Sequence, residues 1–504
     1  MMDWKKHFAR MPVSPADTIM APGHNVWRTV TADKAGFLID GADYFEALEE
    51  SLGHAREQVF IIGWDFNPDI RLRPADPGSP TLGQTLLSLV ERKRDLNIHI
   101  LVWSMGPVYS GKSLKILKRR RWNAHPRIHF RLDTRHAVRG SHHQKLVVVD
   151  DALAFVGGID LTHKRWDTAE HRANDPLRVT PKREAYEPVH DLQMVMNGEA
   201  AETAGEVARR RWLQATGETL ETPRCHTVPV PELARHLLSD MEVGFARTEP
   251  SIRNSPPVRE SFRLTLDCLA SANTCIYIES QYFANAEVAD ILEQKLLRPD
   301  GPEVVVITTR TSHGFLERVV LGENRDRMIR KLRQADKYGR FRAFYPVVAT
   351  DTAEPQEVLV HAKLLLIDNR FIRVGSANLN QRSVGLDTEL DVAIEARLPQ
   401  EERILESLRH RLVSEHLGTS QAAVERQFRQ SNSLVRTIEE LNMGRRGLRP
   451  FSGTGAPGKT DLHFATGLVD PRAPWWPLRP FKVKPLAKLQ GFELPKQSSE
   501  GEPG

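Results

Sequence analysis

The alternation of apolar and polar positions predicts the same order of helices and strands twice along the chain. In the first half, residues 44–55 have the spacing of an amphipathic helix, and residues 58–65 form an apolar run typical of a buried strand. In the second half, residues 262–270 and 274–281 repeat that pair. Further apolar runs follow at equivalent places, at residues 98–103 and 304–308, and at residues 127–132 and 341–346.

A short polar pattern also occurs twice. In each copy, a histidine and a lysine two positions later precede four apolar residues and an aspartate. The copies are His143, Lys145 and Asp150, and His361, Lys363 and Asp368. The offset between them is 218 residues, and the glycine turns that follow, at residues 157 and 375, have the same offset. A constant offset over the whole block indicates an internal duplication.

The strand geometry decides which side chains share a face. Residues two apart on an extended strand point the same way, so His143 lies beside Lys145 and His361 beside Lys363. The two aspartates fall off that face and begin tight turns, which favours a structural role for them. If the two halves pack about a pseudo-twofold axis, two imidazoles and two ammonium groups meet in one cleft. The lysines can then neutralise a phosphodiester while one histidine attacks phosphorus and the other protonates the leaving oxygen.

Each imidazole also needs a carboxylate to fix its tautomer. The next strand downstream in each half offers Asp191 and Glu389, and Asp391 could serve in place of Glu389. The other seventeen histidines are scattered, and we expect them at the surface or in the core rather than as metal ligands. Residues 160–190 are rich in charge and longer than the matching stretch of the second half, which predicts an inserted surface loop.

The expected fold class is α/β, with two pseudo-symmetric lobes, each a mixed, largely parallel sheet flanked by helices, and the active site at their interface. A chain of 504 residues is too long for one hydrophobic core. We expect an N-terminal lobe at residues 1–245 and a C-terminal lobe at residues 258–418. Residues 419–504 are expected to form a C-terminal helix and a tail rich in proline and glycine.

Composition adds little to this prediction. The net charge of +5 suits an anionic partner without requiring one, and the three cysteines have no metal-binding spacing. Neither a signal peptide nor a membrane span is visible, so we expect a cytoplasmic or peripheral membrane protein, with signal-independent release left open. Basic residues 112–122 and the tail around Trp475 and Trp476 are candidates for contact with lipid headgroups.

The duplicated motif resembles that of the phospholipase D superfamily. The flanking segments resemble its eukaryotic-type branch, and they are residues 155–161 with 165–167, 276–283, 375–383 and 411–418. The resemblance extends from about residue 42 to residue 418. It implies a two-lobe α/β sandwich that transfers a phosphatidyl group to water or an alcohol, with no metal in the phosphate site and no cofactor.

The implied activity is that of a phospholipase D, which hydrolyses glycerophospholipids to phosphatidic acid and free headgroup, with transphosphatidylation, through a phosphohistidine. A cardiolipin-synthase-like phosphatidyltransferase is an alternative, disfavoured because those proteins usually carry N-terminal membrane spans. A metal-independent nuclease is less favoured, because small nucleases of the superfamily have one motif per chain and dimerise. The expected partner is phospholipid at a membrane surface, not nucleic acid, and the expected state is a monomer with internal pseudo-twofold symmetry.

Roles of single residues also come from the resemblance. By analogy, His143 is the nucleophile and His361 the general acid and base, although pseudo-symmetry leaves their order open in the sequence alone. Asp160 stands where many members have an asparagine, and it is expected to organise Lys145 or its loop. The implied phosphate-binding residues are Lys145, Lys363, Ser376 and Asn378.

Overall fold

The structure is a computed structural model that describes most of the chain. The described residues are 18–106, 121–224, 226–252, 255–311, 315–352, 354–452, 454–455 and 458–474. Of the two segments suggested for membrane contact, residues 112–120 of the first and all of the second lie outside them. None of the described helices combines the length and the apolar character that a membrane span needs.

The first half folds as its hydropathy pattern predicts. Its helices are α2 (Asp40–His54), α3 (Leu82–Arg92) and α5 (Glu199–Thr216). The apolar stripe of α2 is buried, which explains why this segment forms an amphipathic helix against the sheet. The strands are β1 (Arg28–Ile39), β2 (Gln58–Gly63), β3 (Asn97–Trp103), β4 (Ile128–Asp133), β5 (Leu146–Val149), β6 (Leu153–Gly157), β7 (Val189–His190) and β8 (Leu192–Asn197).

The second half repeats this order. Its helices are α6 (Glu260–Ser271), α7 (Ala286–Leu297), α8 (Phe315–Ala335), α9 (Arg382–Gly385) and α10 (Pro399–Leu417). Its strands are β9 (Arg235–Glu249), β10 (Val258–Arg259), β11 (Cys275–Ser280), β12 (Glu303–Thr308), β13 (Phe341–Val348), β14 (Gln356–Glu357), β15 (Leu359–Val360), β16 (Lys363–Ile367), β17 (Phe371–Gly375) and β18 (Glu389–Glu395). The duplication seen in the sequence is therefore a duplication of structure.

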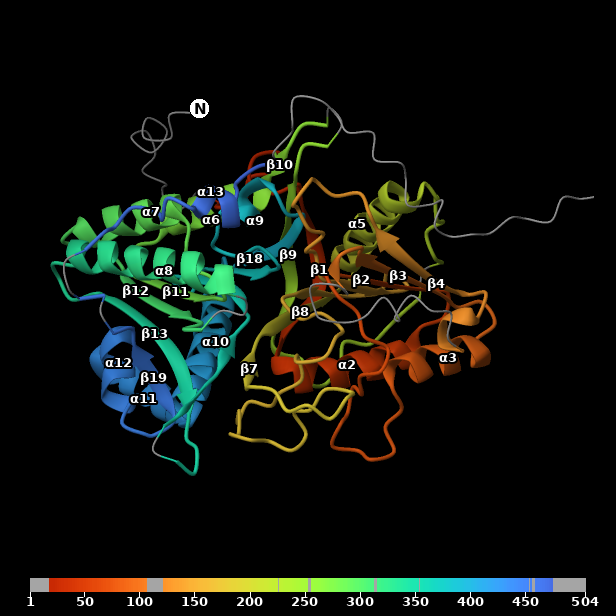
Figure 1. The fold of residues 1–504 in the computed structure, drawn as a ribbon, viewed down its shortest axis with the longest axis horizontal. Helices are drawn as coiled ribbons and strands as arrows, with labels where there is room; N and C mark the ends of the chain where they lie inside the picture. Colours follow the sequence, from red (N-terminus) through yellow and green to blue (C-terminus); the bar gives the residue numbers. More distant parts are fainter. Residues whose placement is uncertain are drawn as a thin grey trace, which may run out of the picture. The chain divides into compact units, whose positions relative to one another are not determined.

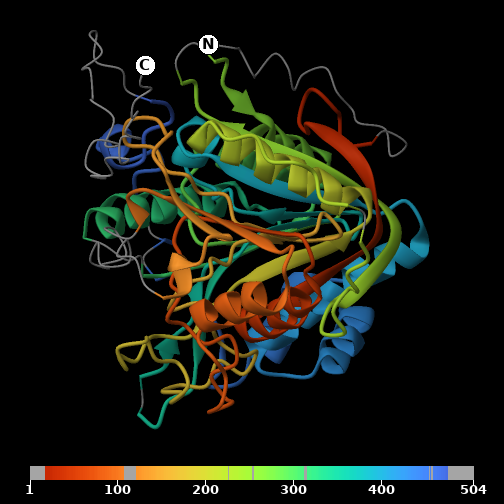
Figure 2. The same ribbon diagram turned by 90° about the vertical axis from the view of Figure 1, so that its right-hand side faces the viewer.

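Hydrogen-bonded ladders join the strands in a symmetric order. The series runs β4, β3, β2, β5, β6, β8, β1, and then β9, β18, β17, β16, β11, β12, β13. The long strands β1 and β9 lie alongside each other at its centre (Figure 2). Each strand of one half thus has a counterpart in the other at the same distance from that centre.

The sheet is mixed, as expected, but parallel ladders are a minority in this series. Only β2–β3–β4 and β11–β12–β13 run parallel. Each histidine motif continues as a hairpin, β5–β6 in one half and β16–β17 in the other. A hairpin pairs its strands antiparallel, and the strands beside each hairpin also pair antiparallel with it. Antiparallel ladders therefore outnumber the parallel ladders that the sequence led us to expect.

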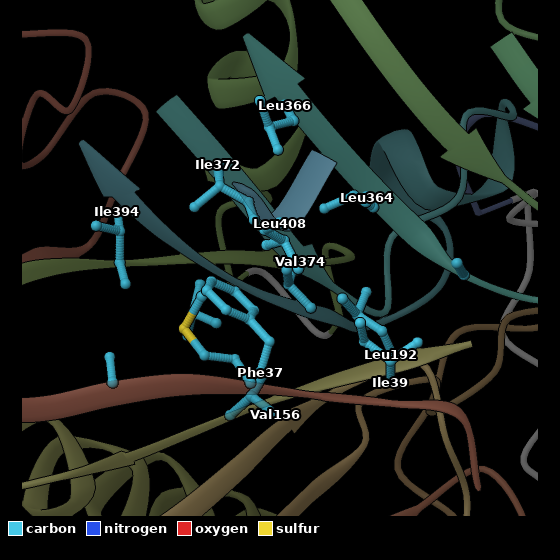
Figure 3. Close-up of a cluster of buried hydrophobic side chains, with 14 of the residues drawn as sticks. Phe37, Ile39, Val156, Leu192, Leu364, Leu366, Ile372, Val374, Ile394 and Leu408 are labelled. Atoms are coloured by element: carbon cyan, nitrogen blue, oxygen red, sulfur yellow. The ribbon is translucent and has the colours of Figure 1, made fainter. Parts of the chain in front are cut away.

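One apolar core is shared by the two halves. Figure 3 shows Phe37 and Val156 of the first half facing Leu364, Ile372 and Val374 of the second, and all five side chains are buried. Helices α2 and α3 lie over the outer core of the first half, and α6, α7 and α8 over that of the second (Figure 1). Side chains of β5 and β16 both belong to the shared core, so burial of that core holds the two motif strands together.

The segment after residue 418 extends the second half. It forms α11 (Gln421–Ser431), α12 (Leu434–Leu441), β19 (Gly447–Pro450) and α13 (Thr466–Val469). Strand β19 pairs antiparallel with β13. Residue 245, the expected end of the first lobe, lies inside β9, which pairs with both β1 and β18, so the backbone passes between the halves within a strand.

Candidate active site

Short pairings between the halves precede both histidine motifs. Strand β15 pairs in parallel with β7, and His142 forms a parallel bridge with Thr388. The peptide N–H of His361 donates to the carbonyl oxygen of His190 at 2.7 Å, and that of His143 donates to Thr388 at 3.0 Å. The residue that follows His190 or Thr388 is an acid in both cases. The pairing therefore sets each motif histidine beside an acid of the other half.

The two imidazoles contact those acids directly. Nδ1 of His143 lies 2.9 Å from Oε2 of Glu389, and Nδ1 of His361 lies 2.6 Å from Oδ2 of Asp191. The sequence identifies both acids as candidates on the strand downstream within each half, and the structure shows that the contacts cross between halves. An acid that holds Nδ1 directs Nε2 of the ring towards substrate.

Burial and positive neighbours act on both imidazoles in the same direction. The pKa of His143 is lowered well below its usual 6.5 by burial and then by Lys145 and Lys363. The pKa of His361 is also lowered well below that value, by burial and then by Lys363 and Arg165. Both rings are therefore neutral near pH 7, which is the form that can attack phosphorus.

The two motif lysines are almost completely buried but have different partners. Nζ of Lys145 lies 3.2 Å from Oδ2 of Asp160 and donates to the carbonyl oxygen of His143 at 2.9 Å. Nζ of Lys363 has an amide oxygen, Oε1 of Gln281, at 3.3 Å, and burial lowers the pKa of Lys363. The ammonium group of Lys145 thus contacts a carboxylate directly, whereas that of Lys363 contacts an amide oxygen and has Asp191 as its main charged neighbour.

Asp160 connects Lys145 to its loop. In addition to the lysine contact, its Oδ1 accepts the peptide N–H of Trp64 at 2.8 Å. Its counterpart, Asn378, donates its own peptide N–H to Oγ of Ser383 at 3.1 Å. The phosphate contact expected of Asn378 remains a prediction.

Two serines surround Glu389. Oγ of Ser376 lies 2.6 Å from Oε2 of Glu389, and Oγ of Ser383 lies 2.7 Å from its Oε1. Ser376 also accepts the peptide N–H of Leu390, so its only hydroxyl hydrogen points at the acid, and the expected phosphate contact would break that bond. Burial and the neighbouring Asp387 raise the pKa of Glu389 to about 8.

Asp191 is placed by a close approach of backbone instead. A Cβ atom on Gly158, the counterpart of Ser376, would lie 2.2 Å from Oδ1 of Asp191, so only glycine fits there. The peptide N–H of Leu192 donates to the same oxygen at 2.8 Å. Burial raises the pKa of Asp191.

Asp391, the alternative to Glu389 in the sequence, lies elsewhere. Its Oδ2 is 3.2 Å from Nη1 of Arg373, and its Oδ1 accepts the peptide N–H of Ala377 at 3.1 Å. It supports the glycine turn of the second motif, while Glu389 contacts the histidine.

Asp150 and Asp368 accept hydrogen bonds from the backbone at the start of β2 and of β11. Each carboxylate accepts three consecutive peptide N–H groups at 2.6–2.9 Å. The donors are Arg56, Glu57 and Gln58 for Asp150, and Asn273, Thr274 and Cys275 for Asp368. Neither carboxylate points at an imidazole in these contacts, as the strand parity predicts.

The expectation of a surface loop at residues 160–190 is wrong for its charged centre. Asp167, His171 and Arg178 are buried there, because Asp167 accepts from Arg178 at 2.9 Å and lies 2.9 Å from Nδ1 of His171. Charge in a sequence predicts exposure only when the charges are unpaired.

The same loop supplies a site residue that the sequence analysis missed. Nη2 of Arg165 lies 3.4 Å from Nε2 of His361. Arg165 also lines a cavity of about 690 Å³ together with Trp64, Tyr186 and Leu359. The segment 165–167 is one of those that carry the family resemblance, but nothing in its pattern shows that the guanidinium reaches the histidine of the other half.

Buried histidines outside the motifs also gather behind the site. His190 and His416 both contact Glu279, each at 2.8 Å through Nε2, and His171 lies against Glu415 at 3.3 Å. The expectation that these histidines are scattered does not hold for these three, because strands and loops distant in sequence bring them together.

Each half of the chain matches a model of a known protein family. Residues 51–233 match the family model described as "Phospholipase D", and residues 265–410 match the one described as "Cardiolipin synthase, PLD-like domain". The chain is 25% identical to phospholipase D1 of Saccharomyces cerevisiae over 502 residues, which cover 77% of this chain and 29% of that protein. It is 24% identical to phospholipase D A of Dictyostelium discoideum over 464 residues, 75% of this chain and 35% of that protein. The chain thus spans about a third of the length of these relatives.

A solved structure shares the fold. The phosphatidylserine synthase of Haemophilus influenzae Rd KW20 superposes with a TM-score of 0.52 at 13% identity, covering 81% of this chain and 96% of that one. At this level of identity the likeness concerns the fold alone. The matches to both halves, together with the duplicated motif, show that the chain belongs to the phospholipase D superfamily, in its eukaryotic-type branch.

Proposed function

We propose that this chain is a phospholipase D that transfers the phosphatidyl group of a glycerophospholipid through a covalent phosphohistidine. One observation supports this above the others. Two neutral imidazoles, each held at Nδ1 by an acid of the opposite half, stand beside two buried lysines. That set can bind a phosphodiester, attack it and protonate its leaving group without further protein groups.

Binding begins with the lysines. The ammonium groups of Lys145 and Lys363 neutralise the non-bridging oxygens, and Asn378 is proposed as a further donor. Carboxylates offset part of both charges, Asp160 that of Lys145 and Asp191 that of Lys363.

In the first step, Nε2 of His143 attacks phosphorus and the bond to the headgroup oxygen breaks. His361, protonated at Nε2 in the complex with the anionic phosphate, gives that proton to the leaving oxygen. In the second step, neutral His361 takes a proton from water or an alcohol, whose oxygen attacks phosphorus and displaces His143. Water yields phosphatidic acid, and an alcohol yields a new phosphodiester.

The acceptor defines a second candidate function. The match of residues 265–410 to a model described as a cardiolipin synthase domain supports transfer to the alcohol of another lipid as this second candidate. Both reactions use the same covalent intermediate, so the geometry of the histidines does not separate them. Since one chain supplies both histidines, a monomer forms a complete site.

A liposome assay tests the proposal. Purified protein should release headgroup and phosphatidic acid from phosphatidylcholine or phosphatidylethanolamine vesicles, and should form phosphatidylbutanol when butanol is added. The Lys363→Met variant is the matched inactive control. Cardiolipin made from phosphatidylglycerol, with little hydrolysis, would support the transferase instead, and cleavage of DNA without turnover of any lipid would refute both.

A further inference from the structure

Four side chains from distant segments meet near Asp191, which lies between β7 and β8. They are Asp40 at the start of α2, His171 in the loop before β7, His190 in β7 and Glu415 in α10. All four are at most 3% exposed, and their ligating atoms lie within 4.8 Å of one another. The cluster is separate from the phosphate site, because none of its members contacts a motif lysine through its side chain in the described contacts.

The spacing of the four groups suits a small cation. Nδ1 of His190 lies 3.0 Å from Oδ1 of Asp40 and 2.9 Å from Oε1 of Glu415. Nε2 of His171 lies 3.3 Å from the same oxygen of Glu415 and 3.6 Å from Oδ2 of Asp40. Ligands bound to Zn²⁺ at roughly 2.0–2.1 Å in a tetrahedron stand about 3.3 Å apart, which is the centre of this range.

Two of these atoms lack a hydrogen bond. Nδ1 of His190 and Oδ2 of Asp40 are buried, and neither finds a hydrogen-bond partner among the described residues. The oxygens within 3.0 Å of His190 are therefore close without the direction that a hydrogen bond needs. A buried nitrogen and oxygen in this state point to a ligand between them.

The outer nitrogens of both histidines are held by carboxylates. Nδ1 of His171 lies 2.9 Å from Asp167, and Nε2 of His190 lies 2.8 Å from Glu279. An outer carboxylate that accepts the ring N–H leaves the lone pair of the inner nitrogen facing the cluster. This carboxylate–histidine arrangement is the usual outer shell of a metal-binding histidine.

The charges also leave room for a divalent ion. Four carboxylates, those of Asp40, Asp167, Glu279 and Glu415, converge on the two imidazoles. Two arginines compensate part of this charge, Arg178 on Asp167 and Arg411 on Glu415. The nearby Arg446 offsets a further part, and a divalent cation or added protons on the imidazoles can balance the remaining negative charge.

We propose that Asp40, His171, His190 and Glu415 bind one divalent transition-metal ion, for which Zn²⁺ is the best match to two imidazole nitrogens and two carboxylate oxygens. Four protein ligands leave no open position, so the site is structural rather than catalytic. Two of the four proposed ligands also contact the backbone of the active site. The peptide N–H of Asp40 donates to Asp191 at 2.8 Å, and His190 accepts the peptide N–H of His361. The ion would fix the backbone beside the His361–Asp191 pair.

Metal analysis of the full chain tests the proposal independently of its activity on lipid. Purified protein dialysed against metal-free buffer should retain about one equivalent of zinc per chain. The His171→Ala and Glu415→Gln variants should retain less than about a tenth of that amount. The control is His99→Gln, which removes a buried histidine that stacks on His129 outside the cluster and should leave the metal content unchanged.

If the cluster variants fail to fold, the wild-type chain still decides the matter. Stripping with a strong chelator should lower its melting temperature, and Zn²⁺ should restore it. Co²⁺ added to the stripped protein should give the intense visible absorption of four-coordinate cobalt. A folded wild-type chain without bound metal, whose melting temperature does not respond to Zn²⁺, Co²⁺, Fe²⁺ or Mn²⁺, would overturn the proposal and leave the protons as the balancing charges.

Discussion

The two halves of the molecule share one ladder order but surround their histidines differently. His361 pairs with Asp191, which packs directly on Gly158, whereas His143 pairs with Glu389, which Ser376 and Ser383 hold through hydroxyl groups. The duplication thus conserves where an acid meets a histidine and changes how that acid is supported.

The difference extends to the electrostatics of the two rings. Burial raises the pKa of Glu389, the acid beside His143, to about 8. The ring of His361 instead has the guanidinium of Arg165 at 3.4 Å from Nε2. Two identical side chains in unlike surroundings can take opposite roles in one reaction, and the predictions below test which role belongs to which half.

The largest effect is expected from the histidines themselves. His143→Ala and His361→Ala should each reduce turnover of natural lipid by about 10⁴-fold or more, since each removes a group that makes or breaks a bond. With a phosphatidyl ester of a good leaving group such as nitrophenol, His361→Ala should accumulate a phosphohistidine on His143, detected by mass spectrometry. An adduct on His361 in the His143→Ala variant would reverse the roles of the halves.

The acids come next. Asp191→Asn and Glu389→Gln should each lower kcat by about 10²–10⁴-fold, as when the acid of a catalytic triad becomes an amide. Because Asp191 serves the acid His361, the nitrophenyl ester should restore much of the first step in Asp191→Asn, measured as a burst of nitrophenol, and little of it in Glu389→Gln. The opposite pattern would mean that each acid acts on the histidine of its own half.

The fold was predictable because its signals are local and repeated. The apolar runs at residues 98–103 and 304–308 correspond to β3 and β12, and the helix expected at 262–270 to α6. The acids Asp191 and Glu389 could be named as candidates for the same reason, since Asp191 directly precedes β8 and Glu389 begins β18.

What the sequence did not reveal depends on contacts between distant segments. The crossing of acids between halves follows from the β7–β15 ladder and the bridge of His142 to Thr388, which join residues about 170 and 246 positions apart. Burial of Asp167 and His171 depends on pairs within a loop that has no periodicity, and on contacts of His171 with Asp40 and Glu415 from distant helices. Neither hydropathy nor spacing within a single segment encodes such contacts.

A smaller effect is expected at the residues next to the glycine turns. Asn378→Asp should lower kcat/KM by about 100-fold if Asn378 is the phosphate donor proposed above, because a carboxylate cannot donate to the developing negative charge. Asp160→Asn should lower it less than about tenfold, since that residue positions Lys145 and the Trp64 loop. Restored activity in the double variant would show that the two positions are interchangeable and that the halves differ less than proposed.

The pH profile should show about a tenfold loss per pH unit on its alkaline side. A lowered pKa means that Lys363 loses its proton, and with it the charge that binds phosphate, at a lower pH than an ordinary lysine. The alkaline limb of kcat/KM should therefore lie below pH 10.5, the usual lysine value, and bound phosphate should move the limb of kcat higher. Lys363→Arg should remove this limb, and a limb that stays in place would assign it to another group.

The smallest effect on activity is expected from the turn aspartates, where the halves can be compared through stability. Asp150→Ala should cost about 3 kcal/mol of unfolding free energy, because its three peptide donors lose a buried charged acceptor. Asp368→Ala should cost about 1 kcal/mol, because Asp368 is only half-buried and water can replace it beside exposed Asn273 and Thr274. Urea unfolding measures both losses, and kcat per folded molecule should not change. Equal losses of unfolding free energy would mean that the two aspartates stabilise their halves equally. The asymmetry would then be confined to the groups around the histidines.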